Sequence, residues 1–243
     1  MQPRRALALA GICIMTAGCS SHSTQATPTA TVSTSATTST AATPLAEAAL
    51  DGLLLSPAEI NTAMGASQLS VTRDTKDMVD NSASFSRPEC LPIDSPGEAK
   101  AYSGSGSTAV REQDLSDPAR TYMAVQAVVL FPSAQQAAAF FKASSQSWQA
   151  CSDGSFVNTL SGGREVWDVG PISNTKGILS TVTRMHTEEY DGPTTNEGAA
   201  LTGQRVLTVR NNVVVDIAAA SSTANDSAGV NIAQQIAAKV PSG

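Results

Sequence analysis

The spacing of apolar residues predicts a strand and then a helix in the middle of the chain. Residues 122–131 become continuously apolar at 127–130, which is typical of a central strand. Pro132 ends this strand, and Ser133 with Gln136 forms a capping box that opens a helix over 134–150. One helix face carries a stripe that Cys151 continues, so we expect this face and the thiol to be buried. The stripe consists of Ala137, Phe140, Phe141, Ser144 and Trp148.

The C-terminal part of the chain predicts a hairpin and a last helix. Residues 204–219 contain two apolar runs around Arg210-Asn211-Asn212, and asparagine tolerates the positive φ that tight turns require. The last helix is expected to start at Asn225 or Asp226 as its cap, to run to Lys239 and to stop at Pro241. Its buried stripe consists of Val230, Ala233, Ile236, Ala237 and Val240.

A short helix and two more strands complete the predicted elements. Ser56-Pro57-Ala58-Glu59 is a capping box with proline at the first helical position, so a helix should run over 57–64 and end at Gly65. Further strands are expected at 165–169 and 177–185. Strands joined by short turns, with helices between them, predict a single α+β domain over residues 45–243.

The N-terminus has the pattern of an export signal. Arg4 and Arg5 precede an apolar run at 6–15, which is too short to span a bilayer as a helix. The run ends on Ala17-Gly18-Cys19 and resembles a bacterial lipobox, although Thr16 stands where Leu, Val or Ile is usual. We therefore expect a lipoprotein signal peptide over 1–18 and a Cys19 that carries diacylglycerol and palmitate chains. The alternative is an ordinary secreted protein that is cleaved near Ala17.

Residues 19–44 are expected to form a disordered tether. Ser20 to Pro44 contains no charged residue and one bulky aliphatic, Val32, so it cannot bury enough apolar surface to fold. Its Ser, Thr, Ala and Pro residues are typical of a linker, either O-glycosylated or unmodified. The expected location is the extracytoplasmic face of the cell membrane, through the lipid anchor on Cys19.

The charge of the chain excludes one class of partner. The net charge is −6, and it becomes −8 once Arg4 and Arg5 leave with the signal peptide. The isoelectric point is about 4.9. No basic stripe is present to neutralise phosphates, so we expect no nucleic-acid partner.

The chain contains four cysteines, of which two should remain in the folded domain. Cys13 leaves with the signal peptide and Cys19 is the lipidation site. Cys90 and Cys151 form an even pair in an oxidising compartment, so a disulfide is expected. Two free thiols or a redox pair are the alternative, but neither a CxxC spacing nor a flanking cation favours them.

The sequence shows no catalytic or metal-ligating pattern. His22 lies in the tether and His186 precedes an acidic stretch, so neither a histidine cluster nor a Ser-His-Asp set is expected. The run at 103–107, Ser-Gly-Ser-Gly-Ser, is interpreted as a flexible or tightly turned loop. The acidic residues Asp114, Asp117, Glu188, Glu189 and Asp191 could supply a carboxylate pair, but no spacing selects two of them. We therefore expect no catalytic residues, no metal and no cofactor.

Five segments of the chain together show a resemblance to a known family. They are LLLSPAEINTAMG (53–65), RPEC (87–90), AYSGSGSTAVREQ (101–113), AVVLFPSAQQAAAFFKASSQSWQAC (127–151) and GQRVLTVRNNVVVDIAAA (203–220). These segments resemble the PknH-like extracellular sensor domain family, which occurs on mycobacterial serine/threonine kinases and lipoproteins. The resemblance covers residues 50–241 and implies a single α+β domain with a mostly antiparallel sheet and a broad cleft for an unidentified ligand.

The resemblance also implies two disulfides. Cys90 and Cys151 match one of them, whereas the positions of the second are Gly203 and Ala220 here. Because both cysteines of the second bridge are missing, no odd thiol remains.

Three hypotheses for function follow. The first is a cell-envelope lipoprotein that binds or senses a small-molecule or envelope ligand and passes the signal to a partner, since this chain has no kinase domain. The second is an interaction or structural lipoprotein that engages another envelope protein. The third and weakest is a hydrolase.

Overall fold

The structure is a computed structural model that describes residues 43–160, 163–190, 200–223 and 227–241. The predicted signal peptide, Cys19 and almost all of the predicted tether lie outside these residues. Within the described part of the chain, no helix is long and apolar enough to cross a membrane.

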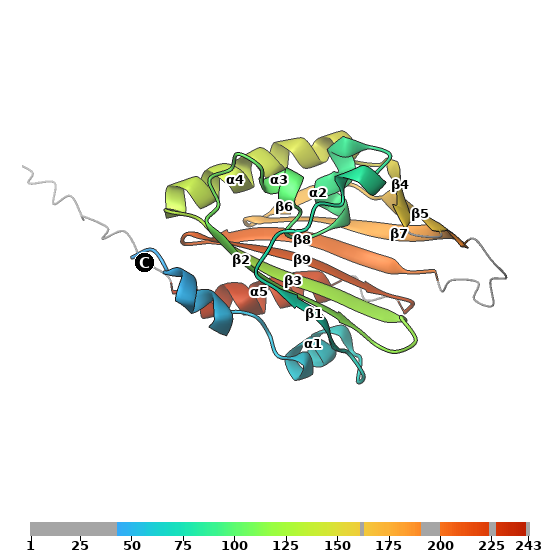
Figure 1. The fold of residues 1–243 in the computed structure, drawn as a ribbon, viewed down its shortest axis with the longest axis horizontal. Helices are drawn as coiled ribbons and strands as arrows, with labels where there is room; N and C mark the ends of the chain where they lie inside the picture. The colour runs from blue at the N-terminus through green and yellow to red at the C-terminus, as the bar shows by residue number, and fades with distance from the viewer. Residues whose placement is uncertain (1–42, 161–162, 191–199, 224–226, 242–243) are drawn as a thin grey trace, which may run out of the picture. The chain divides into compact units, whose positions relative to one another are not determined.

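The described residues form a nine-stranded sheet in which every strand pair is antiparallel (Figure 1). The order along the sheet is β1-β2-β3-β9-β8-β7-β5-β4, and β6 pairs with β7. The strands are β1 (Ser70–Thr75), β2 (Ala109–Ser116), β3 (Tyr122–Leu130), β4 (Ser155–Leu160), β5 (Gly163–Val169), β6 (Ser173–Thr175), β7 (Ile178–Tyr190), β8 (Thr202–Arg210) and β9 (Val213–Ser221).

Helices lie on both faces of this sheet. We call the face covered by α4, α2 and α3 the front face, and the face covered by α1 and α5 the back face (Figure 1). The α-helices are α1 (Pro57–Met64), α2 (Leu91–Asp94), α3 (Ala99–Tyr102), α4 (Ala134–Ser147) and α5 (Ala228–Lys239). The 3₁₀ helices are η1 (Glu47–Gly52), η2 (Ser82–Ser84), η3 (Pro88–Cys90) and η4 (Trp148–Cys151).

Each face of the sheet has its own apolar core. On the back face, Ile232 and Ile236 of α5 and Ile60 of α1 pack against alternate residues of the central strands, among them Val215 and Ile217. On the front face, Trp148 and Phe131 pack with the strand residues that point the other way. The sheet is therefore buried on both sides at its centre.

The helices with local sequence signals are where the sequence predicts them. Ser56 and Glu59 make the reciprocal bonds of a capping box at the start of α1, and Gly65 ends this helix at φ 67°. The Ser133 hydroxyl accepts a hydrogen bond from the Gln136 backbone N–H at the start of α4. The predicted helix 134–150 is α-helical only to Ser147 and then continues as the 3₁₀ helix η4.

The predicted hairpin is also present, as β8 and β9 joined at Asn211-Asn212, with Asn211 at φ 52°. The last helix starts at Ala228, and its proposed caps Asn225 and Asp226 lie outside the described residues. The strands β2, β4 and β6, and the position of β1, were not predicted from the sequence. In the loop after α3, Gly104 and Gly106 both have positive φ, which confirms a tight turn there.

Candidate ligand-binding cleft

The front face of the sheet changes from apolar to polar along the central strands. At one end α4 packs over β8 and β9, and the side chains beneath it are apolar. Two residues further along each strand, the same face becomes charged, and at the other end it carries small side chains. The successive rows across β3, β9 and β8 are Val129, Val214 and Val209; Ala127, Asp216 and Leu207; Val125, Ala218 and Arg205; and Met123, Ala220 and Gly203.

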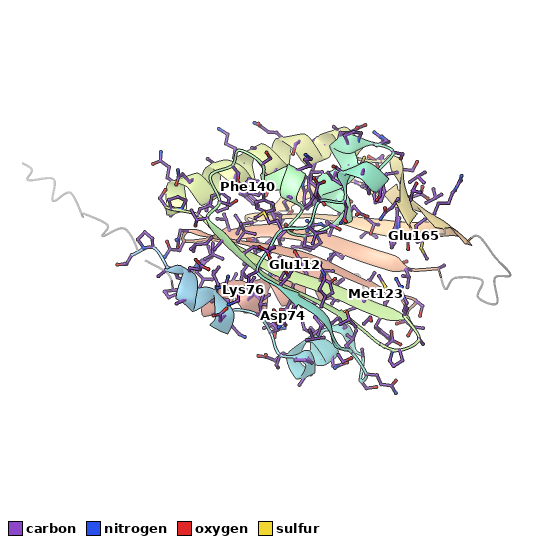
Figure 2. The ribbon with its side chains drawn as sticks, viewed as in Figure 1. Asp74, Lys76, Glu112, Met123, Phe140 and Glu165 are labelled. Carbon is purple, nitrogen blue, oxygen red and sulfur yellow. A yellow bond between two sulfur atoms is a disulfide. The ribbon has the colours of Figure 1, made fainter. Side chains whose placement is uncertain are left out.

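A cavity of about 390 Å³ opens over the small-residue end of this face. Its floor includes Ala218, Ala220 and Gly203, and Met123 of β3 lies at its border. Strands β4 and β5 form one side, and α2 with the loop at Asn81 forms another. Figure 2 shows Met123 and Glu165, which line the cavity, toward the end of the sheet away from Phe140 of α4. The volume lies within the range of small-molecule sites, roughly 300–1,000 Å³.

A buried ion pair separates this cleft from the apolar core beneath α4. Arg205 and Asp216 are 3 % and 1 % exposed, and the Nη1 atom of Arg205 contacts Oδ1 of Asp216. The guanidinium also donates to the backbone carbonyls of Ile217 at 2.9 Å and Ser95 at 3.2 Å. Its central carbon lies 5.2 Å from the centre of the Trp148 ring, a distance typical of a cation–π contact.

Two further donors hold the Asp216 carboxylate. The Tyr102 hydroxyl donates to Oδ2 at 2.9 Å, and the backbone N–H of Gly97 donates to the same atom at 3.1 Å. Burial of Tyr102, together with the negative charge of Asp216, raises the pKa of the phenol well above its usual value. Tyr102 therefore stays protonated and keeps donating to the carboxylate.

Strands β4 and β5 present a polar and aromatic wall to the cleft, formed by Phe156, Asn158, Glu165 and Trp167. Phe156 pairs with Trp167 and Asn158 pairs with Glu165, so the four residues share one face of the two strands. The Trp167 indole N–H donates to Glu165 Oε2 at 3.0 Å. We call this group the β4–β5 wall.

Asp94 faces this wall from the end of α2. Its Oδ1 atom lies 3.5 Å from the side-chain nitrogen of Asn158, and its Oδ2 accepts from the Ser95 hydroxyl at 3.2 Å. Desolvation raises the pKa of Asp94 to about 7, and the nearby charge of Glu165 adds to this effect, whereas Ser95 and Arg205 oppose it. At neutral pH this carboxyl is therefore divided between its charged and neutral forms.

A second charged group lies at the border of the cleft, between β1 and β2. Arg73 donates to Asp114 Oδ2 at 2.8 Å and contacts Glu112 through Nη2. Asp114 lines the cleft, whereas Glu112 is 1 % exposed and its Oε2 has no hydrogen-bond partner within the described residues. Burial raises the pKa of Glu112 to about 7 despite the positive charge of Arg73.

The predicted disulfide between Cys90 and Cys151 is present, with 5.2 Å between the two Cα atoms and both residues fully buried. It joins η3, directly before α2, to η4 at the end of α4. Ile93 and Asp94 of α2 line the cleft, so the bridge fixes the element that carries this side of the site.

Among the acidic residues named in the sequence analysis, Asp114 and Asp117 are the two whose side chains the structure describes, and they have different partners. Asp114 lines the cleft, whereas Asp117 accepts from the Tyr122 backbone N–H and the Thr121 hydroxyl in the turn between β2 and β3. Glu188 and Glu189 lie in β7, as does the backbone of His186, and Asp191 is outside the described residues. No group of three His, Cys, Asp or Glu residues suited to a metal ion occurs in the described part of the chain.

The sequence analysis predicted no ligand-binding residues, so it did not identify the side chains that build the cleft. The missed side chains come from four separate segments, and only alternation along β5 gave a signal, placing Glu165 and Trp167 on one face. The residues are Asp94, Asn158, Glu165, Trp167 and Arg205.

Comparison with known proteins identifies the family. The sequence profile described as "PknH-like extracellular domain" matches residues 45–239. This chain belongs to the PknH-like extracellular domain family. It is 32 % identical over 199 residues to the serine/threonine-protein kinases PknH of Mycobacterium bovis and Mycobacterium tuberculosis, a match that covers 81 % of this chain. The match spans only 31 % and 29 % of those two relatives, about a third of their length.

A solved structure supports the same conclusion. The crystal structure of the extracellular domain of PknH from Mycobacterium tuberculosis superposes with a TM-score of 0.72 at 27 % identity, covering 81 % of this chain and 97 % of that one. The α+β fold with a large antiparallel sheet is therefore confirmed. The matched part of PknH is an extracellular domain and not a catalytic one, so the described part of this PknH-like chain is an extracytoplasmic, sensor-like domain.

The two positions assigned to the missing second bridge of the PknH-like family are direct neighbours. Gly203 pairs with Ala220 across β8 and β9, and both line the floor of the cleft. A Cβ atom built on Gly203 would lie 3.3 Å from the Cβ of Ala220 and 2.7 Å from Oγ1 of Thr183. Thr183 therefore lies where a side chain at position 203 would pack.

Proposed function

We propose that this protein is a lipid-anchored lipoprotein of the cell envelope whose extracytoplasmic domain binds a small ligand in the cleft and thereby acts as a sensor. The observation that carries the proposal is the cleft itself. A cavity of about 390 Å³ is bordered by an aromatic pair and by buried charged groups, in a domain of the PknH-like extracellular family. Concave sites of this size with a few oriented polar groups are typical of small-molecule binding.

The attachment of the N-terminal segment supports this arrangement. At the tip of the β8–β9 hairpin, Asn212 exchanges two hydrogen bonds with the backbone of Leu45, and Asn211 donates to the Thr43 carbonyl at 2.9 Å. Gly203 and Ala220, in the cleft floor, lie near the opposite ends of these strands. At about 3.3 Å per residue the two ends are on the order of 25 Å apart. A lipid anchor at Cys19 would therefore join the domain far from the cleft.

Binding in the cleft is favoured over docking of a protein partner. Val71, at 38 % exposure, is the large hydrophobic side chain that the described residues leave exposed, so they offer no broad apolar patch for a partner. The cleft, in contrast, combines aromatic rings with buried polar groups that carry unused hydrogen-bonding capacity.

A thermal-shift screen tests the proposal. The mature protein in detergent would be heated with fractions of an envelope extract, and at least one fraction should raise the melting temperature. The same fraction should have little effect on a Gly203→Trp variant, whose side chain would fill the cleft floor. Equal stabilisation of both proteins, or of neither, would contradict ligand binding in the cleft. In-cell cross-linking that captures one protein neighbour in both forms would favour the interaction hypothesis instead.

A further inference from the structure

Two buried polar atoms of cleft residues lack a hydrogen-bond partner within the described residues. One is the acceptor Oδ1 of Asn158, and the other is the donor Nε of Arg205. Arg205 is 3 % exposed, and its other guanidinium nitrogens are already used by Asp216 and backbone carbonyls. A buried polar group without a hydrogen-bond partner lowers the stability of the folded state. A ligand that fits this cleft must therefore offer both a donor and an acceptor, and a hydroxyl group offers both.

The β4–β5 wall adds a flat apolar surface next to these atoms. Phe156 and Trp167 are cross-strand partners that both line the cleft. Phe156 is 3 % exposed and packs on Phe85 with ring centres 4.6 Å apart, so the more accessible ring of the pair is that of Trp167. The indole N–H of Trp167 is used by Glu165, so the remaining contact surface of Trp167 is its apolar ring. A ligand that packs on this wall needs an apolar face as well as hydroxyl groups.

The charges around the cleft favour an uncharged ligand. The carboxylates of Asp94 and Glu165 would repel an anion, and the positive charge of Arg205 is balanced by Asp216. Arg120, the other arginine that lines the cleft, is exposed, so solvent screens its attraction for an anion. A cation would gain little from Asp94 at neutral pH, because desolvation keeps part of this carboxyl protonated. A neutral ligand is not repelled by these carboxylates and does not depend on the charge of Asp94.

We propose that the cleft binds a neutral saccharide, with one face of the sugar ring on Trp167 and its hydroxyl groups bonded to Asn158, Arg205 and Asp94. This inference deepens the proposed function and depends on it. Sugar rings combine an apolar C–H face with hydroxyl groups that donate and accept, and the cleft offers the complement of both. Asp94 can serve in either protonation state, because a neutral carboxyl donates one hydrogen bond and a carboxylate accepts several.

The two tryptophans of the chain allow a direct test. Trp148 is 1 % exposed, so in a Trp148→Phe background the fluorescence comes from Trp167 in the cleft. The mature protein would be probed on an array of neutral di- to tetrasaccharides of pyranose and furanose sugars, and each hit titrated by fluorescence and calorimetry. We expect a saturable change in Trp167 emission with at least one saccharide, and unchanged affinity by calorimetry in the protein with both tryptophans.

Matched variants locate the binding. Asn158→Ala should weaken the affinity at least tenfold and Trp167→Ala should abolish binding. Asn174→Ala should change nothing, because this exposed residue of β6 lies outside the cleft. Melting curves of each variant establish that it is folded. Equal affinity in Asn158→Ala and Asn174→Ala would overturn the assignment.

The comparison probes separate the two proposals. Spermidine and citrate serve as a cationic and an anionic probe of similar size. Stabilisation by either of them or by an envelope fraction, without any response to the saccharide array, would overturn the saccharide inference and leave ligand binding standing. No response to any probe or fraction would overturn both.

Discussion

Arg205 and Asp216 form an ion pair at the boundary between the apolar core and the cleft. The two residues come from adjacent strands, and both are almost completely buried. Removing water from two charges is costly, so such a pair persists only when additional hydrogen bonds satisfy it. Here those bonds come from Tyr102, Gly97 and three backbone carbonyls, which join α3, the loop before it and the sheet.

Removing one member of this pair should strongly destabilise the fold. Asp216→Ala leaves a buried guanidinium without its counter-charge, so we expect the free energy of unfolding to fall by about 3–5 kcal/mol. Tyr102→Phe removes one hydrogen bond to a charged group and should cost about 1.5–3 kcal/mol. Urea denaturation of the two variants measures both values. A loss below 1 kcal/mol for Asp216→Ala would mean that water reaches Arg205 easily.

The bridge between Cys90 and Cys151 should contribute to stability and to the cleft. The two cysteines are 61 residues apart, and loop-closure entropy then predicts a contribution of about 4 kcal/mol. The Cys90→Ser/Cys151→Ser double variant should lose up to this amount in urea denaturation. It should also bind ligand more weakly, because α2 follows Cys90 directly. Unchanged affinity in a clearly destabilised variant would show that α2 is held by other contacts.

Local signals explain which parts of this fold the sequence predicts. The strand at 122–131, the helices after Ser56 and Ser133 and the hairpin at 204–219 have periodicity or caps within a few residues. Strand β2 lacked such a signal, because Arg111, Glu112 and Asp114 break the apolar alternation and form ion pairs with η1 and β1. Polar residues that pair across strands cannot be distinguished from exposed ones in a single sequence.

The cleft depends even more on long-range pairing. Asn158 meets Glu165 through the β4–β5 register and Asp94 through a contact 64 residues away. Arg205 contacts Ser95, 110 residues earlier in the chain. Contacts between residues so far apart in the sequence do not produce a local periodic pattern. The cleft residues come together only when the sheet is assembled.

The second bridge of the family should be restorable. Gly203→Cys with Ala220→Cys places two thiols on directly paired residues, and Thr183→Ala removes the hydroxyl that lies 2.7 Å from the new Cβ. Closing this short loop should add about 3 kcal/mol to the free energy of unfolding. Thiol titration and melting with and without reductant measure the result. Persistent free thiols in the triple variant after air oxidation would show that the strands are too tightly held to adopt the bridge.

Glu112 should make the protein less stable as the pH rises. Its pKa is raised from 4.5 to about 7 by burial, so between these values the folded state binds more protons than the unfolded state. The free energy of unfolding should therefore fall with increasing pH across this window, and Asp94 adds a change of the same sign. Arg73, Asp114 and Asp216 are the charged groups that act on Glu112.

A matched pair of variants isolates this effect. Glu112→Gln should gain stability relative to the wild type between pH 4.5 and pH 8, on the order of 3 kcal/mol. Glu89→Gln should not, because a backbone hydrogen bond and Arg87 lower the pKa of that exposed carboxyl. Urea denaturation at several pH values measures how the free energy of unfolding of each variant changes with pH. If the free energy of unfolding changed with pH in the same way for the wild type and Glu112→Gln, Glu112 would be ionised across the whole pH range tested.

Loss of the proposed lipid anchor should release the protein from the membrane. One acyl chain gives only marginal binding and stable anchoring needs two or more, which a lipidated Cys19 would supply. The net charge of the domain offers no substitute, because an acidic protein is not attracted to anionic lipid. In fractionated cells Cys19→Ala should therefore appear in the soluble exported fraction, whereas Cys13→Ala, which changes only the predicted signal peptide, should stay with the membrane. Retention of Cys19→Ala in the membrane fraction would contradict lipidation at this residue and favour an anchor of another kind.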